Sequence, residues 1–163
     1  MKVYELRCEQ RFPSGITETF EFFKDPRNLS RITPPWLDFS IKSADLVIET
    51  GAQIDYRIKW WGIPLRWRTL ISEYEPPFHF VDVQLEGPYR FWEHTHVFRP
   101  SEEGTLVTDT VRYVLPFGPL GRVVHAMTVR RQLAAIFQFR QQILTEILGG
   151  QAMGYPLIET AVI

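Results

Sequence analysis

Hydrophobic and polar residues alternate along the first dozen positions of the chain. Tyr4, Leu6 and Cys8 fall on one side of an extended segment, and charged residues stand between them. Successive side chains of a strand point to opposite faces. The pattern therefore predicts a strand over residues 2–12 with one face in water.

Two short helices are predicted after this strand. Apolar residues recur at helical spacing over residues 16–23, behind Ser14 as a candidate N-cap. A second helix is expected to begin at Asp25 and Pro26, because Asp caps helix N-termini and Pro fits the first helical position. The prolines at 34–35 are expected to end it.

Strands dominate the middle of the chain, where short alternating runs are separated by Pro and Gly. About six consecutive strands are expected, over residues 37–41, 54–60, 65–71, 78–86, 89–98 and 105–115.

A long amphipathic helix is predicted over residues 120–148, ended by two glycines, with a length of about 43 Å at 1.5 Å per residue. Consecutive strands followed by a helix favour an α+β fold with an antiparallel sheet. The apolar stripe of the helix has to cover one face of that sheet, and a strongly curved sheet leaves room for a cavity beneath it. The pattern does not place the tail over residues 151–163.

Composition narrows the classes of protein. The chain has 163 residues, of which 45% are hydrophobic and 23% charged, as expected for one folded domain. The net charge of -1 argues against a dedicated nucleic-acid binder. Cys8 is the only cysteine, and the sequence contains neither a leader-like nor a membrane-spanning apolar run. A soluble cytoplasmic protein, monomeric or homodimeric, is expected.

The main candidate site lies on the strand over residues 89–98. Trp92, His94 and His96 share one face, because side chains repeat every two residues. They could hydrogen-bond a ligand in an apolar pocket, act as acid–base groups, or bind a metal. The alternative is that this face of the strand lies in water, or that the histidines are buried and hydrogen-bonded to neighbouring residues. Metal binding ranks last because no third ligand stands at a recognisable spacing, so neither metal nor cofactor is predicted.

The residues that meet the histidines depend on the hairpin register. A two-residue loop at residues 87–88 places an apolar residue opposite His94, whereas a longer loop brings Asp82 or Gln84 beside the histidines. The longer loop is favoured, because Pro88 cannot adopt the positive φ of a tight hairpin turn.

Aromatic residues make up 14% of the chain, more than a small core needs. Any one of these rings could belong to the ordinary core, but as a set Tyr56, Trp60 and Trp67 are predicted to line the cavity with Trp92. Arg112 is a further candidate ligand-binding residue if its strand face points inward, where a buried cation needs an anionic partner. If that face points outward, Arg112 is solvated.

A family resemblance covers residues 1–148. It is carried by NLSRITPPW over residues 28–36, GPYRFWEHTHVF over residues 87–98 and LPFGPLG over residues 115–121. With the order of elements, these segments resemble the START-like superfamily, in particular the bacterial branch labelled "polyketide cyclase/dehydrase" or "cell-division-inhibitor-like". The resemblance implies the α+β helix-grip fold: a curved antiparallel sheet of six to seven strands around the C-terminal helix, with an apolar pocket between them. The tail over residues 149–163 departs from it.

Reversible binding of a hydrophobic or aromatic small molecule or lipid, as a carrier or sensor, is the leading functional hypothesis. His94, His96, Asp82 and Gln84 would orient the ligand. A polyketide cyclase or dehydratase that uses His94, His96 and Asp82 as acid–base groups is the alternative. An interaction or dimerisation domain that docks through its apolar tail is the second alternative.

Overall fold

The computed structural model describes residues 2–43 and 46–161. Its described strands are β1 (Val3–Phe12), β2 (Ser40–Ile41), β3 (Gln53–Trp60), β4 (Ile63–Glu75), β5 (His79–Glu86), β6 (Phe91–Ser101), β7 (Gly104–Val114), β8 (Gln151–Ala152) and β9 (Leu157–Ala161). The helical elements are α1 (Ile16–Lys24), α2 (Pro26–Leu29), a 3-10 turn (Pro35–Leu37), α3 (Gly118–Val124), a π turn (His125–Val129) and α4 (Arg130–Leu148).

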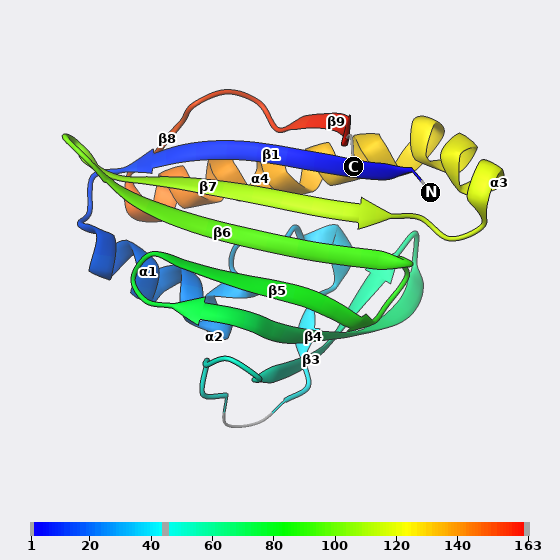
Figure 1. Ribbon diagram of the computed structural model, residues 1–163, viewed down its shortest axis with the longest axis horizontal. Helices are drawn as coiled ribbons and strands as arrows, with labels where there is room; N and C mark the ends of the chain where they lie inside the picture. The colour runs from blue at the N-terminus through cyan, green and yellow to red at the C-terminus, as the bar shows by residue number, and fades with distance from the viewer. Residues whose placement is uncertain (1, 44–45, 162–163) are drawn as a thin grey trace.

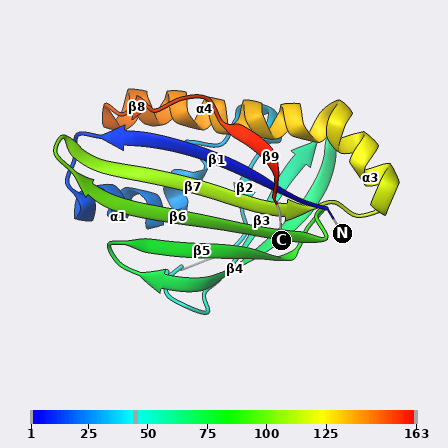
Figure 2. The same ribbon diagram turned by 45° about the horizontal axis from the view of Figure 1, so that its top comes forward.

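All described strands form one antiparallel sheet, in the order β2-β3-β4-β5-β6-β7-β1-β8, with β9 also beside β1. The sheet curves around α4, which lies along one of its faces (Figures 1 and 2). The two short helices α1 and α2 lie toward the end opposite α3 (Figure 1). The predicted helix-grip arrangement is therefore confirmed.

The number of strands is higher than the six to seven predicted, because the tail contributes two more. Nine strands are present in the described ranges. β9 pairs with β1, with Ile158 opposite Leu6, and Ile158 is buried. The two tail strands therefore pair with the edge of β1 that does not face β7. The sequence pattern of the tail alone does not predict this pairing.

The N-terminal helices confirm one predicted cap and correct the other. Asp25 accepts a hydrogen bond from the backbone N–H of Arg27 at 2.9 Å, as an N-cap should. The first helix is capped by Gly15 with no side-chain bond, so Ser14 is not its N-cap. The Ser14 carbonyl instead accepts a hydrogen bond from the hydroxyl of Thr105.

The long C-terminal helix is confirmed, with one local deviation. It runs through residues 118–148 and ends at Gly149, whose φ of 70° fits the left-handed cap that glycine tolerates. The π turn inside it was not predicted. There the ring of His125 stacks on Tyr4 at 3.6 Å between centroids, and the Tyr113 hydroxyl lies 2.8 Å from its Nε2.

Two apolar clusters hold the sheet, the helix and the N-terminal helices together. One contains Trp67, Trp92 and Phe137, and the other contains Phe20 and Phe98 under α1. Within the described residues, no helix combines the length and the hydropathy needed to cross a membrane.

Candidate functional site

A cavity of about 190 Å³ lies between the sheet and α4, with residues from α1 to the 3-10 turn along its side. Its lining is mostly apolar and aromatic. A cavity of about 150 Å³ lined by apolar side chains is large enough for one benzene ring. Seven of the nine predicted site residues line it, namely Tyr56, Trp60, Trp67, Asp82, Trp92, His94 and His96.

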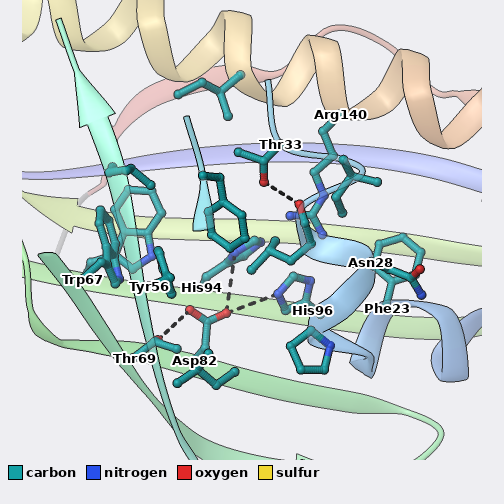
Figure 3. Close-up of a pocket in the computed structure, with 18 of the residues that line it drawn as sticks. Phe23, Asn28, Thr33, Tyr56, Trp67, Thr69, Asp82, His94, His96 and Arg140 are labelled. Atoms are coloured by element: carbon teal, nitrogen blue, oxygen red, sulfur yellow. Dashed lines mark hydrogen bonds and ion pairs between the residues drawn. The ribbon is translucent and has the colours of Figure 1, made fainter. Parts of the chain in front are cut away.

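The hairpin register brings Asp82 to the histidines, as the longer-loop prediction required. β5 and β6 pair with Asp82 opposite His94 and Phe80 opposite His96. Four residues, 87–90, separate the two strands. Figure 3 shows the carboxylate of Asp82 pointing at both imidazole rings.

A second carboxylate, Asp109 on β7, flanks the histidines from the other side. Asp109 stands opposite His96, just as Asp82 stands opposite His94, so each acid is diagonal to the other histidine. Asp109 Oδ1 lies 2.6 Å from His96 Nδ1 and 3.2 Å from His94 Nε2. Asp82 Oδ2 lies 3.4 Å from His96 Nε2 and 3.7 Å from His94 Nδ1. Each ring therefore turns one nitrogen to each carboxylate.

The orientation of Asp82 is fixed by Thr69 on β4. The Thr69 hydroxyl lies 3.2 Å from Asp82 Oδ1 as a hydrogen-bond donor (Figure 3). It is also 3.1 Å from the carbonyl oxygen of Val83. The contact with Oδ1 leaves Oδ2 of Asp82 to the two histidines. Nearby, burial and then the charge of Asp82 raise the pKa of Tyr56 well above its usual value, so its hydroxyl stays neutral.

Burial disfavours the charged form of all four groups in the cluster. The charges of the neighbouring groups then decide the direction in which each pKa shifts. Burial and then the charge of His96 lower the pKa of His94. For His96 the effect of burial is outweighed by Asp109 and Asp82, which raise its pKa. Burial is likewise outweighed at both acids: His96 and His94 lower the pKa of Asp82, and Arg140 and His96 hold that of Asp109 well below its usual range. The two carboxylates therefore share the cluster with two imidazoles whose pKa values shift in opposite directions and with the guanidinium of Arg140.

Arg140, on α4, is the charged residue that the helix brings to this cavity. Its side chain is 9% exposed and lies over the rings of Phe23 and Phe137, at 5.6 and 5.9 Å from their centroids. Its Nε is buried and has no hydrogen-bond partner among the described residues. The guanidinium therefore acts on the cluster through its charge.

Sequence reasoning missed Asp109 and Arg140, although each interrupts an apolar pattern. Asp109 stands between Val107 and Val111, which are buried on the same face of β7. Arg140 lies three residues after Phe137 on the buried face of α4. A charged residue within an apolar face is the signal that would have identified both.

Gln84 and Arg112 lie outside the cavity, in contrast to their prediction as ligand-binding residues. The side-chain amide of Gln84 donates to the carbonyl oxygen of Tyr89 at 2.7 Å and thereby closes the hairpin loop. Arg112 is exposed and pairs with Glu5 at 3.1 Å, because it alternates with the inward-pointing Val111.

Comparison with solved structures shows the same fold. TTHA0849 from Thermus thermophilus is 18% identical and superposes with a TM-score of 0.67, over 87% of this chain and 97% of that chain. The di-domain ARO/CYC StfQ from the steffimycin biosynthetic pathway is 13% identical with a TM-score of 0.70, over 91% of this chain and 52% of that chain. Ara h 8.0201 is 15% identical with a TM-score of 0.58, over 88% and 99%. No protein-family model and no curated protein sequence matches the chain. These likenesses establish the helix-grip fold.

Proposed function

We propose that the protein reversibly binds a hydrophobic or aromatic small molecule in the cavity between sheet and helix, as a carrier or sensor. The observation that carries the proposal is a mostly apolar cavity of about 190 Å³ in which Asp82, His94 and His96 converge on the wall formed by the sheet. This is the usual design of a small-molecule site, in which apolar burial supplies affinity and a few polar groups orient the ligand. Asp82, His94 and His96 are the orienting groups.

The cavity volume limits the ligand to about one or two aromatic rings in the conformation described. Burying one ring removes about 200 Å² from water, which at 25 cal/mol per Å² is worth about 5 kcal/mol before the entropic cost of binding. A bare ring is therefore a weak ligand. Tight binding requires a carbonyl or hydroxyl group that reaches the histidine wall.

The ligand would enter where the wall consists of short elements. The cavity is lined here by Leu29 at the end of α2, Ile32 and Thr33 in the segment that follows, and Leu37 in the 3-10 turn. Short elements with few buried contacts open at a lower free-energy cost than a long helix or a central strand. We place the entrance here.

Native mass spectrometry of protein purified from its own host tests the proposal first. A bound apolar molecule, released by solvent extraction and identified, is the expected result. The site is then tested by titration with 1-naphthol, a two-ring phenol, using the tryptophan fluorescence of the protein as the readout.

Two neighbouring tryptophan substitutions on α4 locate the ligand. Ile136→Trp places a ring in the cavity that Ile136 lines, and is expected to weaken 1-naphthol binding at least tenfold. Ala135→Trp, at an exposed position one residue away, is the matched control and should bind as the parent does. Unchanged binding by Ile136→Trp would show that the ligand does not occupy this cavity.

A cyclase or dehydratase-type enzyme is the second candidate. It is favoured by the convergence of Asp82, His94 and His96 on one wall, and by the likeness to StfQ, an ARO/CYC protein. Under this hypothesis His94→Asn abolishes turnover of a short aromatic poly-β-ketone but leaves 1-naphthol binding intact. Equal loss of binding and turnover would remove the acid–base role.

A further inference from the structure

We propose that Asp82, His94 and His96 form a binding site for a divalent transition-metal ion such as Zn²⁺ in the wall of the cavity. Each of these residues offers one ligand atom, and the three atoms all lie within 4.8 Å of one another. Imidazole nitrogen and carboxylate oxygen are standard ligands of zinc. The inference goes beyond the proposed function and does not depend on it, because the ion is held by protein side chains alone.

The spacing between Asp82 and His96 matches that of shared ligands, and the spacing between Asp82 and His94 is slightly longer. Atoms bound to one tetrahedral Zn²⁺ at about 2.0–2.1 Å lie about 3.2–3.5 Å apart. Asp82 Oδ2 lies 3.4 Å from His96 Nε2 and 3.7 Å from His94 Nδ1. These separations are long for charge-assisted hydrogen bonds, which are typically 2.7–2.9 Å.

The opposite side of the histidines has the properties of a supporting shell. Asp109 Oδ1 lies 3.2 Å from Nε2 of His94, a hydrogen bond, and 2.6 Å from Nδ1 of His96, an ion-pair contact. Metal-binding histidines generally donate their second N–H to a carboxylate, which fixes the tautomer. Asp109 is placed to hold His94 in this way and lies close to His96 as well, so that protons on these two nitrogens would leave Nδ1 of His94 and Nε2 of His96 free toward Asp82.

The remaining coordination positions would face the cavity. Asp82, His94 and His96 line it, whereas Asp109 does not. Thr69 bonds Oδ1 of Asp82 and leaves Oδ2 for the ion. Three protein ligands with an open position are typical of sites where zinc polarises a bound molecule, and closed four-ligand sites are typical of structural zinc. A ligand oxygen in the cavity would complete this site.

The third ligand is one that the sequence pattern does not show. His94 and His96 form a recognisable pair in the sequence. Asp82 lies on the preceding strand, and the register of the hairpin decides whether it stands beside the histidines. A slip of one residue would put Val81 or Val83 there instead.

Titration calorimetry with ZnCl₂, on protein stripped with a chelator and without an organic ligand, is the first test. We expect one Zn²⁺ per chain, and at least a tenfold loss of affinity in both His94→Ala and Asp82→Asn. His79→Ala is the matched control, because His79 also stands beside carboxylates, those of Glu73 and Glu75, but at the surface. It should bind zinc as the parent does. Absence of stoichiometric binding, or loss in His79→Ala alone, overturns the proposal.

A measurement on the unmodified protein guards against variants that fail to fold. Nitrogen-15 NMR of the histidine rings reports which nitrogen binds the ion. We expect zinc to shift Nδ1 of His94 and Nε2 of His96, and protons to stay on the two nitrogens that face Asp109. The reverse pattern, or no shift, contradicts the site. Protein that binds 1-naphthol but no zinc refutes the metal site alone, and protein that binds zinc but no apolar ligand refutes only the proposed function.

Discussion

Asp109 is the residue on which the charge balance of the histidine cluster depends, so Asp109→Asn is expected to destabilise the fold strongly. The substitution keeps the side-chain volume and removes a charge that lies 2.6 Å from His96 and holds Arg140 in balance. Removing one partner of a buried charged group costs about 3–5 kcal/mol. A neutral side chain at position 109 also removes an influence that raises the pKa of His96, which limits the loss, so we expect the lower end, about 3 kcal/mol. For a chain of this length that lowers Tm by about 6–12 °C.

Urea unfolding followed by tryptophan fluorescence, in the presence of a chelator, measures this loss without any contribution from metal. Asp55→Asn is the matched control, because Asp55 pairs with Arg68 at 2.8 Å on the surface. Exposed ion pairs are worth about 0–1 kcal/mol. If Asp109→Asn lowers the unfolding free energy no more than Asp55→Asn does, then Asp109 is not coupled to His96 and Arg140 as the geometry indicates.

Three further predictions concern the rest of the fold. Burial lowers the pKa of His125 to about 4 from the 6.5 of the unfolded chain. The unfolded state therefore binds more protons between these values, and stability falls as the pH drops through that window. His125→Phe should reduce the difference in unfolding free energy between pH 7 and pH 5. Ile158→Ala, at a 5% exposed position of β9, should cost about 2–4 kcal/mol in urea unfolding, whereas Leu157→Ala, at 56% exposure, should cost less than about 1 kcal/mol. Gly104→Ala should lower Tm measurably, because Gly104 has a φ of 126° and a Cβ there would clash with the Phe12 carbonyl.

Local patterns predict the elements whose spacing of apolar residues depends only on which of their own faces is buried. β1 and β3 to β7 alternate because one face is buried, and the stripe of α4 repeats because it packs on that face. The tail was not placed, since β9 is defined by its partner β1, about 150 residues away. The π turn is set by the packing of His125 against Tyr4, which helical periodicity does not encode.

The site was predicted as far as strand geometry and turn chemistry reach. A two-residue repeat put His94 and His96 on one face, and the φ of Pro88 favoured the register that brings Asp82. Asp109 requires knowing how β7 aligns with β6, and Arg140 requires knowing which turn of the helix crosses the cavity. Both are properties of packing between distant segments, so a single sequence does not determine them.

The stability of the fold does not explain why ionisable residues, rather than apolar ones, form this wall of the cavity. Removing charges from water costs several kcal/mol per ion, and replacing a buried ionic network by apolar side chains of similar size is often neutral or stabilising. Phe80 stacks on His96 at 4.2 Å between centroids, so rings without charge fit at this level of the sheet. A variant with His94→Leu, His96→Phe, Asp82→Leu, Asp109→Leu and Arg140→Met, which leaves no buried charge of the cluster unpaired, should therefore unfold at a urea concentration no lower than the parent's. It should also lose zinc and bind 1-naphthol more weakly. A loss of several kcal/mol in this variant would instead show that the network serves the fold, and the argument for a functional wall would fail.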